Sequence, residues 1–494
     1  TALSAMAAST SSSITHIKTL SSDLYQYTSA PIFSESLVTL RNISQRSNEP
    51  TAATIRIIMI QPNIPETTKP RIVIVGGGFG GVNLAKNLKN LPVQVVLLDR
   101  NNYHLFQPLL YQVSTAGLEP DSIAFPLRAI FRKQKNLVFR MAEVTGIRPE
   151  ENILETGIGE IRYDHLIFAT GSNTNFFGNK GIEANAIGMK SLIEAVQIRN
   201  YVVKQFEESL LMTNTDDIKA KLNFVMVGGG PTGVELAGAF AELRKYIMPK
   251  DYPDIPQDMM NVYLIEASPR VLNSFSEETS RKTLASLQEL GVRVMTNTGV
   301  KEYDGKTITL STGEQIHTQS LLWAAGVKGI PVKGIPADII LPNGRILVND
   351  LNQVKGFTNV YAIGDIAQMT NDPKFPKGYP MVAQVAIQQG VNVAHNIGLQ
   401  LKSQPMKGFT YKDLGSMATI GRNRAVAEFY GMKLSGYFAW LVWMVVHLMT
   451  LMGFRNKLVV FINWFYRYFT FERGTRIIIK RGAANIVKLK QSVQ

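Results

Sequence analysis

Two periods of hydrophobic and polar residues alternate along the chain, and the clearest change of period lies between residues 71 and 99. An apolar, β-branched run at 72–75 predicts a buried strand. Apolar residues then recur at helical spacing, and a second buried run at 93–98 ends in an acid, Asp99. This order of strand, turn, helix and strand predicts the first unit of a parallel α/β sheet.

The turn after the first strand carries the pattern G-x-G-x-x-G at Gly76, Gly78 and Gly81. In dinucleotide-binding domains such glycines permit the tight turn, the close approach of the pyrophosphate and close helix packing. Asp99 follows Gly76 by 23 residues, at the place where a carboxylate accepts hydrogen bonds from a ribose. The segment therefore predicts a dinucleotide site.

The same pattern recurs after an apolar run at 223–227, with Gly228, Gly230 and Gly233. The next strand ends at Glu266, which lies 38 residues after Gly228, beyond the usual spacing. We attribute the excess to a proline-containing insertion. Two fingerprints imply two dinucleotides, which is the arrangement needed to pass a hydride between them.

Three later apolar runs end in small or acidic residues, where ligands of open α/β sheets bind. These residues are Thr170, Gly171, Ala325, Gly326, Gly364 and Asp365. Thr170 and Gly171 would lie beside the first cofactor, and Ala325 and Gly326 would lie beside the second. Asp365 is expected to accept hydrogen bonds from a sugar-alcohol chain, with a solvent-facing turn residue as the alternative.

Two further segments suggest a flat ring-shaped ligand. Aromatic and amide residues interleave at 103–112, although core packing explains them equally well, and we expect His104 to be a hydrogen-bonded structural residue. Gln384 and Gln388 share one helical face, and their amides suit a neutral carbonyl ligand. Ordinary surface glutamines are the alternative.

The C-terminal part predicts a separate membrane module. The 18 residues 437–454 carry no full charge, which is the lower limit for spanning a bilayer, but a stripe of Trp440, Trp443, His447 and Thr450 indicates an amphipathic helix. In the second apolar segment, 458–471, Arg467 stands among aromatic residues, a position we expect at lipid headgroups. A buried dimer interface is the alternative.

Composition narrows the chemistry. The chain has 494 residues with 45% hydrophobic content, enough for two or three domains, and it has no cysteine, which excludes disulfides, thiolate metal sites and cysteine redox chemistry. The net charge is +14, of which residues 433–494 contribute +9. This concentration beside apolar segments favours an anionic membrane surface over nucleic acid. Residues 1–68 are expected to be a disordered or spurious extension, with Met59 a plausible start.

The chain resembles type II NADH:quinone oxidoreductases, which are single-subunit NADH dehydrogenases that pump no protons. The motifs that carry the resemblance are VGGGFGG, HLFQPLLYQVSTAG, VGGGPTGVELAG, YAIGD, AQVAIQQG, GSMATIGRN and GFRNKLVVFINWFYRYFTFERG. The resemblance implies an α/β fold with two Rossmann-like domains and a C-terminal amphipathic helical module. We expect an FAD-binding domain at 69–175 and 331–430, an NADH-binding domain at 176–330 and the membrane module at 431–494.

Carried over residue by residue, the resemblance assigns two cofactors and a quinone. Non-covalent FAD would contact Gly76, Gly78, Gly81, Asp99, Thr170, Gly171 and Asp365, and NADH would contact Gly228, Gly230, Gly233, Glu235 and Glu266. Gln384 and Gln388 would line the quinone pocket. Many members carry a second Glu where this chain has Ala239, which leaves Glu235 as the candidate near the nicotinamide.

The implied reaction is hydride transfer from NADH to FAD, followed by two electrons to ubiquinone or menaquinone. The implied protein is monotopic on the cytoplasmic face of the cell membrane, or on the mitochondrial inner membrane, and homodimeric. A reductase of a ferredoxin-like carrier would need no membrane module. A binding flavoprotein resembling apoptosis-inducing factor would turn over quinones slowly, and a sulfide:quinone oxidoreductase would need the cysteines that this chain lacks.

Overall fold

The computed structural model of the protein describes residues 62–472 and 474–478. The expected N-terminal extension lies outside the described residues as far as residue 61. The same holds for Arg473 and for the basic end of the tail from residue 479 onward.

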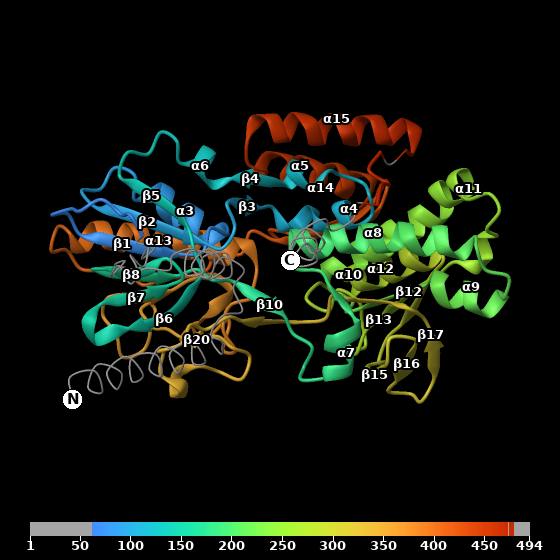
Figure 1. Cartoon of the computed structure of the whole chain (residues 1–494), viewed down its shortest axis with the longest axis horizontal. Coiled ribbons are helices and arrows are strands. Elements are labelled where there is room, and N and C mark those ends of the chain that lie inside the picture. Colours follow the sequence, from blue (N-terminus) through green and yellow to red (C-terminus); the bar gives the residue numbers. More distant parts are fainter. Residues whose placement is uncertain (1–61, 473, 479–494) are drawn as a thin grey trace, which may run out of the picture. The chain divides into compact units, whose positions relative to one another are not determined.

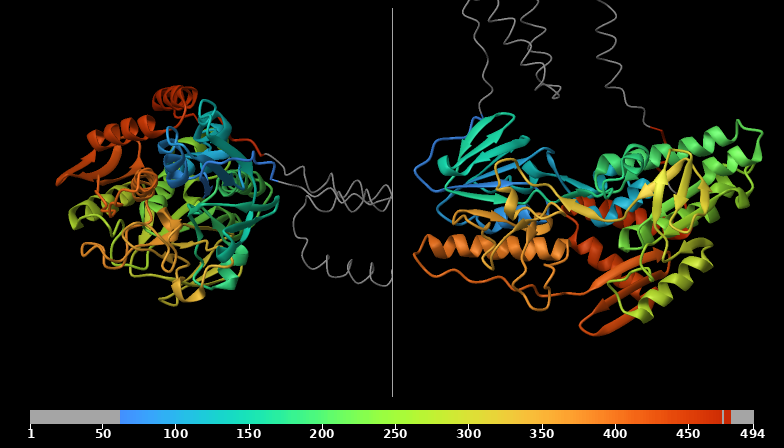
Figure 2. Two further views of the ribbon diagram at one scale, coloured as in Figure 1. Left: turned by 90° about the vertical axis from the view of Figure 1, so that its left-hand side faces the viewer. Right: turned by 90° about the horizontal axis from the view of Figure 1, so that it is seen from below.

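The first domain contains a five-stranded sheet in the order β21-β9-β1-β2-β5, and every pair in it is parallel. Along the chain its strands are β1 (Arg71–Val75), β2 (Gln94–Asp99), β5 (Leu137–Met141), β9 (His165–Phe168) and β21 (Val360–Ala362). Helices α3 (Phe79–Asn87) and α13 (Ala383–Gln400) pack against each other (Figures 1 and 2). The sheet therefore combines strands from both ends of the chain.

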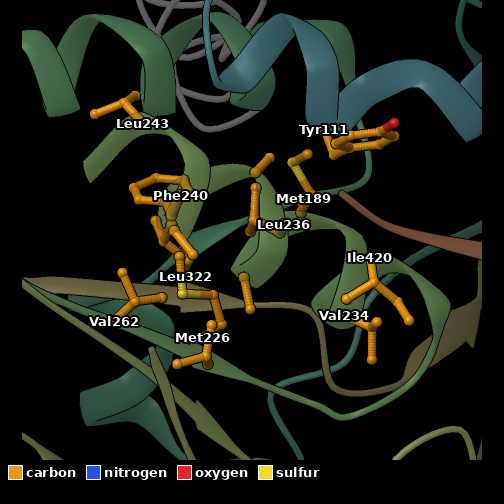
Figure 3. Packing of buried hydrophobic residues seen from close by; sticks show 14 of the residues in the cluster. Tyr111, Met189, Met226, Val234, Leu236, Phe240, Leu243, Val262, Leu322 and Ile420 are labelled. Carbon is orange, nitrogen blue, oxygen red and sulfur yellow. The ribbon is translucent and has the colours of Figure 1, made fainter. Parts of the chain in front are cut away.

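The second domain repeats this plan with the parallel order β11-β18-β12-β13-β14. Its strands are β11 (Ile187–Gly188), β12 (Asn223–Val227), β13 (Asn261–Ile265), β14 (Val292–Met295) and β18 (Ser320–Trp323), and its helices are α8 (Leu192–Ser209), α10 (Pro231–Glu242) and α12 (Glu277–Glu289). Leu236 and Phe240 of α10 are fully buried against the sheet residues Met226, Val262 and Leu322 (Figure 3). This core fixes α10 on the strand that precedes it.

The two sheets are connected through an antiparallel pair of short strands, β10 (Ser172–Thr174) and β19 (Val327–Gly329). Antiparallel three-stranded sheets flank each domain, β6 to β8 over 144–162 and β15 to β17 over 300–317. The segment after the first sheet forms β3 (Tyr103–Leu105), α4 (Leu110–Ser114), α5 (Pro120–Ile123) and β4 (Ala124–Pro126). After α10 the chain continues through a π-helical turn (Leu243–Ile247) into α11 (Met248–Asp251), beyond which the prolines end the helix.

The C-terminal part is an antiparallel sheet, β23 (Ser416–Gly421), β24 (Arg424–Phe429) and β25 (Met432–Gly436). Two helices, α14 (Tyr437–Thr450) and α15 (Phe454–Thr470), follow it (Figure 1). Helix α14 ends because Leu451 adopts extended backbone, and α15 starts after Gly453, whose φ is 83°. The uncharged stretch expected at 437–454 is therefore interrupted. Within the described range, none of the helices is both long enough and apolar enough to cross a bilayer.

Candidate functional site: two nucleotide sites and an aromatic cavity

The first fingerprint forms the turn between β1 and the N-terminus of α3. Gly76 has a φ of 111°, and a Cβ there would overlap the carbonyl of Ala169, while a Cβ on Gly81 would overlap the carbonyl of Gly76. Gly78 differs, because its φ is −74° and a Cβ would meet nothing within 4 Å. Packing thus explains two of the three glycines, and the third leaves open space at a helix N-terminus, where anions bind.

The second fingerprint repeats this geometry between β12 and α10. Gly228 has a φ of 108° and lies against the backbone of Ala324, and a Cβ on Gly233 would overlap the carbonyl of Gly228. Gly230, with a φ of −72°, again has nothing within 4 Å of a Cβ. The sequence therefore builds two equivalent open helix N-termini, one on each sheet.

The two acids that end the following strands support their own loops. Asp99 accepts a hydrogen bond from the backbone N–H of Gly77 at 2.6 Å and another from Asn101 at 2.7 Å. Burial raises the pKa of Asp99, and these two bonds oppose the rise. Glu266 likewise accepts from the N–H groups of Gly229 and Ser268. The sequence predicted only that these acids bind a ribose. The structure shows that they also hold their own loops in place.

Asp365 lies in a short turn at the carboxyl end of β21. Its Oδ2 accepts a hydrogen bond from Ser172 Oγ and lies 3.3 Å from Lys190 Nζ. Within the described part of the chain, Oδ1 accepts no hydrogen bond. Gly364, with a φ of 72°, donates its N–H to Gln389 Oε1 at 2.7 Å. The carboxylate is thus held by one oxygen, and neither Ser172, Lys190 nor Gln389 was found by sequence reasoning.

The other strand-end residues lie around the junction of the two domains. Thr170 donates its hydroxyl to the carbonyl of Ile330, and a Cβ on Gly171 would meet nothing within 4 Å. At the equivalent place in the second domain, Ala325 is half-buried and Gly326 lies against the ring of Phe177.

Gln384 and Gln388 are on α13, but both amides bind backbone groups. Gln388 donates to the carbonyl of Lys412 at 2.8 Å and accepts from the N–H of the same residue at 3.0 Å. Gln384 donates to the carbonyl of Gly415 and accepts from the N–H of Leu414. The structure gives both side chains the task of fastening residues 412–415 to α13, and their expected contact with a quinone stays a prediction.

His104 is hydrogen-bonded, as expected for a structural residue. Its Nδ1 lies 3.0 Å from the carbonyl oxygen of Gly77, and the ring packs edge-on against Phe79 with centroids 5.0 Å apart. Only 1% of the residue is exposed, and burial lowers its pKa. His104 therefore supports the first glycine turn in the neutral form.

A cavity lies between α4, α10, β23 and the two C-terminal helices. Its lining is aromatic and polar, with Tyr111, Gln112, Thr115, Glu235, Ala239, Glu242, Thr419, Gly421, Arg422, Trp440, Trp443, Met444, Trp464, Arg467 and Tyr468. Gln112 links two of these rings, since it donates to Tyr111 Oη and accepts from Trp464 Nε1, both at 2.8 Å. Residues from four distant parts of the sequence therefore form one aromatic compartment.

Glu235 lines this cavity with a carboxyl group whose pKa is raised. It stands on α10 and is only 9% exposed. Burial raises the pKa of its carboxyl to about 8, an increase that the backbone of Thr419 partly opposes. At neutral pH the group is therefore protonated and can donate a hydrogen bond. On α14, His447 is neutral, because burial lowers its pKa to about 4.

The raised pKa predicts a pH dependence of stability. The folded protein keeps a proton on Glu235 that the unfolded chain releases above its ordinary pKa of 4.5, so the free energy of unfolding falls as pH rises from about 4.5 to about 8. Within this window, each increase of one pH unit lowers the free energy of unfolding by up to about 1.4 kcal/mol. We expect Glu235→Gln to remove this slope and to melt higher than the parent at pH 8. Identical profiles of melting temperature against pH, from 5 to 8.5, would contradict the assignment.

Part of the stripe of α14 and the arginine of α15 turn inward, and the position of the arginine corrects one expectation. Trp443 is 2% and His447 9% exposed, with their rings stacked 4.2 Å apart. Arg467, expected at lipid headgroups, instead points into the protein, where its Nη1 donates to the carbonyl of Gly117 at 2.8 Å. A guanidinium on an amphipathic helix can be satisfied by protein carbonyls as well as by lipid, and sequence pattern does not distinguish the two.

The opposite face of these helices is apolar and exposed. On α14 the large exposed side chains include Phe438 and Met449, and on α15 they include Phe461, Phe465 and Phe469. Contiguous apolar surface of this kind marks a protein or membrane interaction site.

Two parallel nucleotide-binding sheets with this connectivity define the class of two-dinucleotide oxidoreductases. The family model described as Pyridine nucleotide-disulphide oxidoreductase matches residues 70–390, and the model NDH2 C-terminal domain matches residues 414–473. The fold is similar to NDH2 from Plasmodium falciparum, solved in complex with NADH, with a TM-score of 0.76 and 23% identity over 83% of this chain and 100% of that one. A sulfide:quinone oxidoreductase from Aquifex aeolicus is similar with a TM-score of 0.62 and 19% identity, covering 85% of this chain and 95% of that one.

Curated relatives narrow the class. Type II NADH:quinone oxidoreductase Ndh of Mycobacterium tuberculosis is 34% identical over 446 residues, which cover 87% of this chain and 95% of the relative. The external NADH-ubiquinone oxidoreductase 2 of Saccharomyces cerevisiae mitochondria is 30% identical and covers 81% of each chain. The chain belongs to the type II NADH:quinone oxidoreductase family.

Proposed function

We propose that this enzyme holds FAD on its first sheet, NADH on its second and a quinone in the aromatic cavity. It is an NADH:quinone oxidoreductase, and the observation that carries the arrangement is the pair of open helix N-termini at Gly78 and Gly230. Each leaves space beside a backbone that points N–H groups outward, as a pyrophosphate requires.

The residues of the first site fit FAD. The open space at Gly78 accommodates the pyrophosphate, Asp99 stands where the ribose binds, and Oδ1 of Asp365 can accept from the sugar-alcohol chain. When bound, FAD would supply the two-electron chemistry that links NADH to the quinone. The protein's own task is to bind both nucleotides and to aim them at the junction marked by β10 and β19.

The second site suits NADH because Glu266 ends the strand beside Gly228. Its carboxylate would accept from a ribose 2′-hydroxyl and repel a 2′-phosphate. We expect Glu266→Gln to lower kcat/KM for NADH roughly tenfold, since hydrogen bonds to charged groups contribute about 1.5–3 kcal/mol, and to improve the use of NADPH. Equal kcat/KM for the two nucleotides in the unmodified protein would sink this proposal.

The aromatic cavity suits a quinone ring. Flat rings stack on Trp and Tyr side chains, and the protonated carboxyl of Glu235 can donate a hydrogen bond to a carbonyl oxygen and later a proton. The cavity lies directly beneath the two C-terminal helices, so an apolar substrate would reach it from lipid.

The exposed apolar face of α14 and α15 would rest in the headgroup region of one leaflet, as in a monotopic protein. Basic residues of α15, including Arg455 and Lys457, would meet anionic lipid. We assign the protein to the cytoplasmic face of the cell membrane. In a eukaryote we assign it to the mitochondrial inner membrane. We also predict a homodimer. Sedimentation in detergent tests this by measuring whether the mass is that of one chain or two.

One experiment tests the function as a whole. Purified protein should be yellow, release FAD on denaturation, and oxidise NADH rapidly with a soluble quinone analogue but slowly with ferredoxin or oxygen. Release of FMN would contradict the cofactor, and faster turnover with ferredoxin would support the protein-carrier alternative.

A further inference from the structure

An ion pair joins the second nucleotide domain to the acid of the first. Lys190 lies two residues after the end of β11, and its ammonium lies 3.3 Å from Oδ2 of Asp365, which follows β21 in the other sheet. Both side chains are largely shielded, 21% and 15% exposed. Because both groups are shielded from water, dissolved salt screens this pair less than an exposed one.

The backbone of Lys190 is fixed by the start of α8. Glu194 Oε2 accepts from the N–H of Lys190 at 2.9 Å and from the N–H of Ser191 at 2.7 Å, and Ser191 caps the helix in return. This capping box holds the residue immediately before the helix. Lys190 therefore extends toward Asp365 from a rigid element.

The pair has a geometric consequence for the carboxylate. Lys190 and Ser172 both bind Oδ2, and Oδ1 accepts no hydrogen bond from the described residues. Ser172 belongs to β10, the strand that leads from one domain to the other. Two donors on one oxygen fix the plane of the carboxylate and leave the other oxygen for a ligand.

We propose that Lys190 is a positioning residue of the FAD site, contributed by the NADH-binding domain. It orients Asp365 so that Oδ1 accepts from the sugar-alcohol chain of FAD, and this inference rests on the proposed function of the first sheet. One consequence is that retention of FAD depends on contact between the two domains, although no residue of the second sheet was expected in the flavin site.

The test is the rate of FAD release from the holoprotein, followed by flavin fluorescence after dilution. We expect Lys190→Met to release FAD at least tenfold faster and Lys190→Arg, which keeps the charge, to recover most of the loss. Lys204→Met is the matched control, because Lys204 is on α8, the helix that follows Lys190, and is 57% exposed and paired with Glu208. It should release FAD at the parental rate.

A double-mutant cycle separates this role from general stability. In an Asp365→Asn background, Lys190→Met should have little further effect on FAD release, because the charge that it orients is gone. An equal acceleration in both backgrounds, or parental release by Lys190→Met, would overturn the proposal. Lys190→Gln serves the same cycle if the Met variant does not fold. Parental protein without FAD would refute the proposed function itself.

Discussion

Replacing Gly230 by Ala should lower kcat/KM for NADH about 100-fold, which corresponds to about 2.7 kcal/mol of lost transition-state binding, while the melting temperature hardly changes. The reason is that the φ of −72° suits any residue and that the added Cβ meets no protein atom within 4 Å. Only a bound pyrophosphate would occupy that space. Stopped-flow reduction of the bound flavin by NADH, together with thermal unfolding, measures both quantities.

Two variants bracket this result. Gly233→Ala should unfold the domain, because its Cβ would overlap the carbonyl of Gly228. Gly78→Ala is the counterpart in the first sheet and should release FAD while the protein still binds NADH. Unchanged kinetics in Gly230→Ala would mean that the open helix N-terminus on the second sheet does not receive the nucleotide.

Filling the aromatic cavity should block the second half of the reaction. Met444 lines the cavity from α14, and Met444→Trp would insert a larger side chain into the space assigned to the quinone ring. We expect kcat/KM for a soluble quinone analogue to fall at least tenfold. Reduction of the flavin by NADH should keep its parental rate, because the variant leaves both nucleotide sites intact.

Met449→Trp is the matched control for this variant. Met449 is on the same helix but 65% exposed, so the substitution adds the same side chain outside the cavity and should not change turnover with a soluble quinone. Equal losses in both variants would indicate a general disturbance of α14. Parental activity in Met444→Trp would place the quinone elsewhere, and the Gln384 and Gln388 face of α13 would then become the first alternative.

The two C-terminal helices show how far pattern reasoning reaches. Their apolar content and charge predicted an amphipathic module, and two amphipathic helices are what the structure contains. Pattern alone did not reveal which face turns inward. That choice depends on the partners in the fold. Trp443 packs against Tyr111 of α4 and His447 against Phe106, while Arg467 donates to the carbonyl of Gly117, 350 residues away in the sequence.

By itself, the sequence determined the two strand-turn-helix units and their glycine pattern, because each fingerprint lies within one short stretch of chain. The close approach of Ala169 to Gly76 and of Ala324 to Gly228 depends on the neighbouring strand of each sheet. The order of the sheets, the cavity around Glu235 and the pairing of Lys190 with Asp365 depend on residues far apart in the chain, 175 positions in the last case. Such contacts form only when the two sheets pack together. Burial also decided the protonation of Glu235. Burial raises the pKa of this carboxyl, and burial depends on the tertiary structure.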